Sequence, residues 1–139
     1  SSGSAAAVTG VLRVGLRLAS VATVLLAGWL ATVVLIVLPA RDPDHVPLWA
    51  VVAIGAAALA LLSWLASTRA SAPSWPARAG LLVLGLAGVG FGLLVLGSTL
   101  SDAVTADPEG YLVVIGGILT AHGILALGWV AAVTIRRDR

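Results

Sequence analysis

His122 is the side chain whose type and position most directly suggest chemistry. It lies in the middle of residues 110–135, a stretch without Asp, Glu, Lys or Arg, and no other titratable side chain occupies the middle of such a stretch. An ionisable group inside a long apolar segment is costly and marks a candidate site by default. Three roles are open for it: a hydrogen bond between helices, ligation of haem, or a step in a proton relay.

Haem with two histidine ligands needs a second histidine near His122. The other one, His45, lies outside the middle of the apolar stretches. A single chain therefore does not place both histidines at one haem, whereas a homodimer would supply His122 twice. We expect no cofactor in the chain itself.

Four apolar stretches must position this histidine, and each predicts a helix. A helix needs about 20 residues to cross a hydrocarbon core about 30 Å thick, and in lipid its backbone groups must pair within the helix itself. The sequence therefore predicts an all-α integral membrane protein with four transmembrane helices in a single domain, residues 1–139. The predicted spans are residues 18–39, 47–67, 79–100 and 111–134.

Two local features bound the first span. Residues 1–4 (Ser-Ser-Gly-Ser) are interpreted as a remnant of cloning and are left out of the prediction. Pro39 and Pro43 are expected to end the first helix, because proline lacks the amide donor that would continue it.

Composition supports lipid as the solvent of this chain. Of 139 residues, 60% are hydrophobic and 10% charged, and the mean hydropathy is +1.10; a soluble domain has roughly 45–50% apolar and roughly 25% charged residues. There is no cysteine, so disulfides, thiolate metal sites and cysteine nucleophiles are excluded. All eight basic residues are arginine, which indicates a GC-rich, bacterial genome.

The arginines predict the orientation. They are concentrated in the N-terminal arm, the loop 68–78 and the C-terminal tail, whereas loops 40–46 and 101–110 carry one arginine and five acidic residues. The positive-inside rule then predicts a multi-pass protein of the cell membrane, with both termini and loop 68–78 cytoplasmic and the other two loops outside. Because the loops are short, we expect an antiparallel up-down bundle with the first helix beside the fourth. Trp129 is expected at the inner membrane interface, among belt aromatics.

In such a bundle Trp29 and His122 both fall near the midplane, so they are expected to share a depth and to contact each other. We take His122, Trp29 and Thr120 as the candidate ligand or proton site. A transporter or channel would need polar groups in the spans. Those available besides His122 are Ser20, Thr23, Thr32, Ser63 and Thr120.

Small residues recur at helical spacing in the third and fourth spans, and they predict helix packing. Such residues let two backbones approach closely where no hydrophobic force drives association. The pattern leaves open packing within one bundle, a homodimer face, or a cavity opposite the third helix. The positions concerned are Gly85, Gly88, Gly92, Gly116 and Gly123.

Charged residues outside the spans form two further candidate sites. Arg13 and Arg17 are four residues apart, on one helix face, and are expected to bind anionic lipid headgroups. Oxygen-rich clusters can hold a divalent cation, but the acidic residues of the outer loops match no known ligand spacing, and no metal is expected. The acidic candidates are Asp42, Asp44, Asp107 and Glu109.

Catalysis is not expected, because no nucleophile or base with an orienting partner can be identified. The sequence instead predicts a non-enzymatic accessory or scaffold component that packs through its small-residue faces. One alternative is a homo-oligomeric small transporter or channel with a site around His122. A second is a haem-binding redox protein using His122, and an enzyme acting on lipid ranks last. The expected partners are the lipid bilayer and a homo-oligomer or larger membrane complex, and not nucleic acid.

Overall fold

The computed structural model describes residues 2–68, 74–101 and 111–137, and the regular structure in these ranges is helical throughout. Four helices are long and apolar enough to cross a membrane, which confirms the all-helical, four-span prediction at that level. The long helices are α1 (Ser2–Thr32), α3 (Val46–Thr68), α4 (Trp75–Ser101) and α5 (Tyr111–Arg137). Between α1 and α3 lie η1 (Val33–Val37), α2 (Leu38–Arg41) and η2 (Pro43–His45).

The first helix is longer than its apolar stretch. α1 begins at Ser2 and so includes residues 2–4, which were interpreted as a remnant of cloning. The candidate membrane span within this continuous helix runs from Ala7 to Arg41. The helix therefore extends well before residue 18, and this extension carries Arg13 and Arg17.

Helical structure continues through Pro39, so the expectation that this proline ends the helix is wrong. Over Val33–Val37 the backbone widens into a π turn, in which the Leu38 amide donates to the Val33 carbonyl five residues back. Proline normally clashes with the carbonyl four residues before it. A π turn is one of the few helix irregularities that relieve such a clash. The helix then ends at Arg41.

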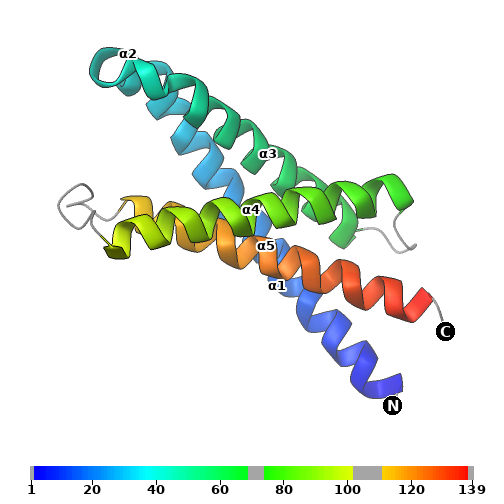
Figure 1. Cartoon of the computed structure of the whole chain (residues 1–139). Helices are drawn as coiled ribbons and strands as arrows, with labels where there is room; N and C mark the ends of the chain where they lie inside the picture. The colour runs from blue at the N-terminus through cyan, green and yellow to red at the C-terminus, as the bar shows by residue number, and fades with distance from the viewer. Residues whose placement is uncertain (1, 69–73, 102–110, 138–139) are drawn as a thin grey trace.

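The four long helices form two pairs that cross each other, α1 with α3 and α4 with α5 (Figure 1). α1 also packs on α5, and α4 on α3, so the first helix lies beside the last. The start of α1, the end of α3, the start of α4 and the end of α5 lie at one end of the molecule (Figure 1), here called the basal end. The turn around α2 lies at the other, the distal end.

α4 and α5 are in backbone contact where both helices carry glycine. A Cβ added at Gly123 would lie 2.6 Å from the Gly85 carbonyl oxygen, and one added at Gly92 would lie 2.8 Å from the Gly116 carbonyl oxygen. At Gly88 an added Cβ would lie 3.3 Å from a carbonyl oxygen of α5. All five glycines singled out in the sequence therefore face the contact between α4 and α5, inside the chain.

Buried apolar side chains form two clusters, one toward each end of the bundle. Trp129, which is 2% exposed, belongs to the basal cluster. It therefore lies inside the bundle and not in a lipid-facing aromatic belt. The basal cluster comprises Leu16, Leu59, Ala66, Leu81, Ala126, Trp129 and Val130. The distal cluster comprises Leu26, Ala27, Leu30, Ala53, Ala56, Ile115 and Leu119.

Gly123→Ala is expected to lower the free energy of unfolding by about 1–3 kcal/mol, because the added methyl group overpacks the α4/α5 contact. Gly90→Ala is the matched control, since a Cβ at Gly90 meets nothing within 4 Å. Denaturant titration of both purified variants in detergent micelles, followed by circular dichroism, measures the difference. Equal stability of the two variants would contradict the contact.

Candidate functional site

The structure places His122 at the centre of the bundle, between hydroxyl groups from two other helices. Its Nδ1 lies 2.6 Å from Oγ1 of Thr23 on α1, and its Nε2 lies 2.9 Å from Oγ of Ser63 on α3. All three side chains are 0% exposed. His122, Thr23 and Ser63, here called the central polar layer, thus join α5 to both α1 and α3.

The hydrogen-bonding capacity of this layer is balanced. A neutral imidazole has one donor and one acceptor nitrogen, and a hydroxyl can donate or accept. In one tautomer Thr23 donates to Nδ1 and Nε2 donates to Ser63, and in the other both directions reverse. Because both ring nitrogens are engaged, ligation of a haem iron by His122 would require one of these hydrogen bonds to break.

Along α1 and α5 the central polar layer lies between the two apolar clusters, whereas along α3 Ser63 lies between Leu59 and Ala66 of the basal cluster. Along α1, Thr23 lies between Leu16 of the basal cluster and Leu26 of the distal cluster. Buried polar side chains in a membrane bundle that bond across helices contribute about 0.6 kcal/mol on average and up to about 1.7 kcal/mol. Ser20 is also buried but contributes no such link, since its hydroxyl donates to the Leu16 carbonyl of its own helix at 2.8 Å.

The pair Ser63 and His122 has the residue types of a nucleophile and its base, but no acidic side chain among the described residues hydrogen-bonds to His122. A serine triad needs an acidic residue on the second imidazole nitrogen, and here that nitrogen contacts Thr23. The acidic side chains that the structure describes, Asp42 and Asp44, lie in the turn at the distal end. The layer itself is enclosed by the helices, since all three of its side chains are 0% exposed.

The structure does not bring Trp29 to His122. Trp29 is 39% exposed, and its ring packs on Tyr111 with centroids 5.2 Å apart. It lies six residues after Thr23, about 9 Å farther along the helix. The register of α1 on α5 therefore sets Thr23, not Trp29, opposite His122.

Thr120 is also separate from the central polar layer. Its Oγ1 is buried and has no hydrogen-bond partner among the described residues, and it lies beside Gly92 in the α4/α5 contact. Thr23 and Ser63 were recognised in the sequence only as polar groups within the spans. Lone hydroxyls in apolar stretches were the available signal, but pairing them with His122 requires the helix register.

The two arginines expected to bind headgroups have different environments. The Arg17 guanidinium donates from Nη2 to the Ser67 carbonyl oxygen at 3.1 Å. Carbonyls in the last turn of a helix lack partners within it, and a cation there interacts favourably with the helix dipole. Arg17 thus ties α1 to the end of α3. Arg13 is half-buried, and its Nε has no partner among the described residues.

The acidic candidates do not form a metal site in the part of the chain that the structure describes. Asp42 lies 2.6 Å from Nδ1 of His45 in an exposed ion pair, and Asp44 is exposed. Among the described residues no three His, Asp or Glu side chains group together. Asp107 and Glu109 lie outside the described residues.

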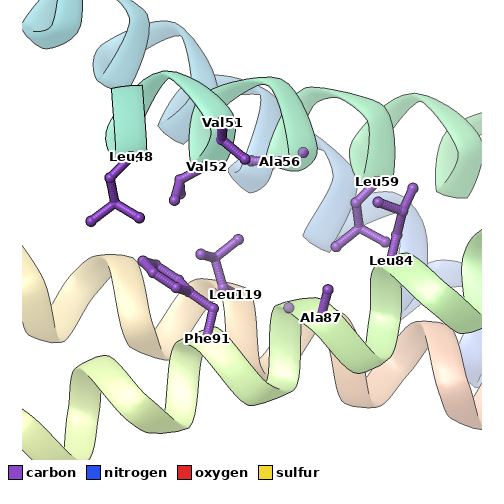
Figure 2. Close-up of a pocket in the computed structure, with 11 residues that line it drawn as sticks. Leu48, Val51, Val52, Ala56, Leu59, Leu84, Ala87, Phe91 and Leu119 are labelled. Carbon is purple, nitrogen blue, oxygen red and sulfur yellow. The ribbon is translucent and has the colours of Figure 1, made fainter. Parts of the chain in front are cut away.

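A groove of about 320 Å³ opens between α3 and α4 toward the distal end. Figure 2 shows side chains of both helices pointing into it, with Phe91 and Leu119 facing Val52 of α3. Every side chain lining it is apolar, and several are large and flexible. They are Leu48, Val51, Val52, Gly55, Ala56, Leu59, Leu84, Ala87, Gly88, Phe91 and Leu119.

A second groove, of about 380 Å³, runs along the seam between α1 and α3 and is here called the α1/α3 groove. Most of its lining residues are alanine or glycine, so the two backbones lie near its surface. A Cβ added at Gly28 would meet nothing within 4 Å. The lining residues are Val24, Ala27, Gly28, Ala31, Ala53, Ile54 and Ala57.

Ser63→Ala is expected to lower the free energy of unfolding by about 0.6–1.7 kcal/mol, because it removes a hydrogen bond between helices. Ser20→Ala is the matched control, since Ser20 is equally buried but bonds within its own helix. A double-mutant cycle of Ser63→Ala with His122→Ala, measured by denaturant titration in micelles, isolates the pairwise contribution. A cycle with no coupling energy would show that the layer does not link α5 to α3.

Comparisons with known proteins add no assignment: no protein-family model, no curated protein and no solved structure matches this chain. Its function must therefore be argued from the geometry. The four apolar helices indicate a small multi-pass membrane protein. Its central polar groups bond to one another, and the two grooves described above are lined by apolar residues.

Proposed function

We propose that this chain is a non-enzymatic component of a bacterial cell membrane, an accessory or scaffold subunit that packs against a transmembrane helix of a partner. The observation that carries this proposal is the closure of the central polar layer. His122, Thr23 and Ser63 satisfy one another and are 0% exposed, so no polar group of the layer is presented to a substrate. What the chain offers to its surroundings is apolar helix surface.

The α1/α3 groove is the surface that suits a partner helix. Between helices in lipid, association depends on close backbone approach, which small residues permit. The five glycines of the α4/α5 contact are already used within the chain, as Gly92 and Gly123 show. Along the α1/α3 groove Gly28, Ala31 and Ala57 are instead exposed, and at Gly28 there is space for another helix to approach.

The transporter and haem alternatives receive less support. A transport pathway would need polar groups along a groove, yet His122 lines neither groove described above. Both of its ring nitrogens already have hydroxyl partners.

The proposal includes an orientation, an antiparallel up-down bundle with both termini in the cytoplasm. Contacts support the antiparallel order: on α1 and α5, Leu12 lies against Gly128 while Gly15 lies against Leu125. Arginine distribution supports the direction, because the basal end carries Arg13, Arg17 and Arg78. The acidic turn with Asp42 and Asp44 would then face outward.

Single cysteines test this orientation, since the chain has none of its own. Asp44→Cys and Ser74→Cys each place one thiol at an exposed position, the first in the distal turn and the second just before α4. In intact cells a membrane-impermeant maleimide is expected to label Asp44→Cys, and to label Ser74→Cys only after permeabilisation. The reverse pattern would invert the orientation, and equal labelling of both would contradict a spanning bundle.

Gly28→Leu is expected to abolish assembly while preserving the fold, because the new side chain fills the α1/α3 groove from its outer side. Gly90→Leu is the matched control, also at a glycine with open space around it. Native mass spectrometry of the chain extracted from its own host's membranes identifies the complex that each variant forms. Loss of the same complex in both variants, or in neither, would contradict the α1/α3 groove as the partner surface. A small-molecule mass bound to the wild type and lost in His122→Ala would favour the transporter or haem alternative.

A further inference from the structure

Three buried N–H donors near the basal end have no hydrogen-bond partner among the described residues. They are Nε of Arg13 on α1, Nε of Arg78 on α4 and Nε1 of Trp129 on α5. Trp129 is 2% exposed, so solvent does not compensate its donor. Buried donors are almost always paired, and each unpaired one needs an explanation.

Helix register places the two arginines over one layer of the core. Arg13 precedes Leu16 by three residues, and Arg78 precedes Leu81 by three. Residues three apart share a helix face, and here they are separated by about 4.5 Å along the axis. Leu16, Leu81 and Trp129 belong to the same basal cluster. Both arginines therefore stand one turn beyond Leu16 and Leu81, toward the basal end.

The contact between α1 and α5 sets the level of Trp129. Leu12 lies against Gly128, and Arg13 and Trp129 are their immediate neighbours in the sequence. Arg13 and Trp129 are thus at nearly the same height in the bundle. Among the described residues, three helices thus each contribute one unpaired buried donor toward the basal end.

The donor set matches one kind of ligand. Two guanidinium groups and an indole N–H can donate but cannot accept, so they cannot pair with one another. Their complement is an anion with several oxygens, and phosphate is the group that arginine recognises best. Arg17 is not part of this set, because its guanidinium donates to the Ser67 carbonyl.

Charge around this end favours the same ligand. Among the described residues, this end carries Arg13 and Arg17 of α1, Arg78 in the first turn of α4, and Arg136 and Arg137 at the end of α5. Arg41 and both described acidic residues, Asp42 and Asp44, lie in the turn at the distal end. Clusters of basic residues at the edge of a transmembrane bundle attract anionic lipid headgroups.

We propose that the basal end of the bundle binds a phosphate group through Arg13, Arg78 and Trp129. The group is either the headgroup phosphate of an anionic phospholipid or free inorganic phosphate, which present the same oxygens. This site does not depend on the α1/α3 groove or on a partner subunit. If the chain binds no phosphate in the test below, the proposed scaffold function is unaffected.

The test uses the full chain in nanodiscs and two probes. In the first arm, nanodiscs of phosphatidylcholine with added phosphatidylglycerol are analysed by native mass spectrometry for retained anionic lipid. In the second, inorganic phosphate is titrated against the chain in pure phosphatidylcholine nanodiscs, and binding is followed by calorimetry. Binding in the first arm alone identifies the lipid headgroup, and binding in the second identifies free phosphate.

Arg13→Gln and Arg78→Gln are each expected to weaken binding about tenfold or more, because each removes a charge-assisted hydrogen bond. Trp129→Phe is expected to weaken it less, since it removes a neutral donor. Arg41→Gln is the charge-matched control and is expected to leave binding unchanged. If a glutamine variant fails to fold, Arg78→Lys replaces it; it keeps the charge but lacks the planar guanidinium, so binding should still weaken. Equal effects at Arg41 and Arg78, or no binding of either probe, would overturn the proposal.

Discussion

The hydrogen bonds of His122 to Thr23 and Ser63 hold three of the four long helices to one another. Within a bilayer the hydrophobic effect does not draw helices together, because lipid tails are as apolar as the side chains they replace. Association must then come from buried hydrogen bonds and close packing. The central polar layer supplies buried hydrogen bonds for α1, α3 and α5. Close packing comes from the glycine contact of α4 with α5, which attaches α4 to the other three long helices.

Some glycines of this bundle pack against a neighbouring helix backbone, whereas others face open space. At Gly92 and Gly123 the neighbouring backbone lies so close that no larger residue fits, whereas at Gly28 and Gly90 an added Cβ would meet nothing. The first two hold the chain's own helices together. Of the second two, Gly28 lies in a groove lined by other small residues. A surface suited to another helix is therefore distinguished by open space at a glycine together with small neighbouring residues, and not by the number of glycines.

The two ends of the bundle differ in how their charges are used. At the distal end Asp42 pairs with His45 within the turn. At the basal end Arg17 bonds to a terminal carbonyl of α3, while Arg13 and Arg78 retain buried donors without partners among the described residues. The basal end is therefore the one where buried donors of charged side chains lack partners among the described residues. A ligand from outside the chain would accept hydrogen bonds from these donors.

Four apolar helices, their approximate bounds and the special position of His122 follow from the sequence alone, because length, composition and the cost of a buried ionisable group are local properties. The sequence also marked the five glycines as small positions at helical spacing. Only the tertiary structure decided what these residues face. Rotation and register of α1 on α5 set Thr23 rather than Trp29 against His122. They also put Trp129 in the core. Continuation of the first helix through Pro39 depends on the π turn over Val33–Val37. Helices that are apolar on every side carry little periodic signal for rotation, so register emerges from the packing of all four together.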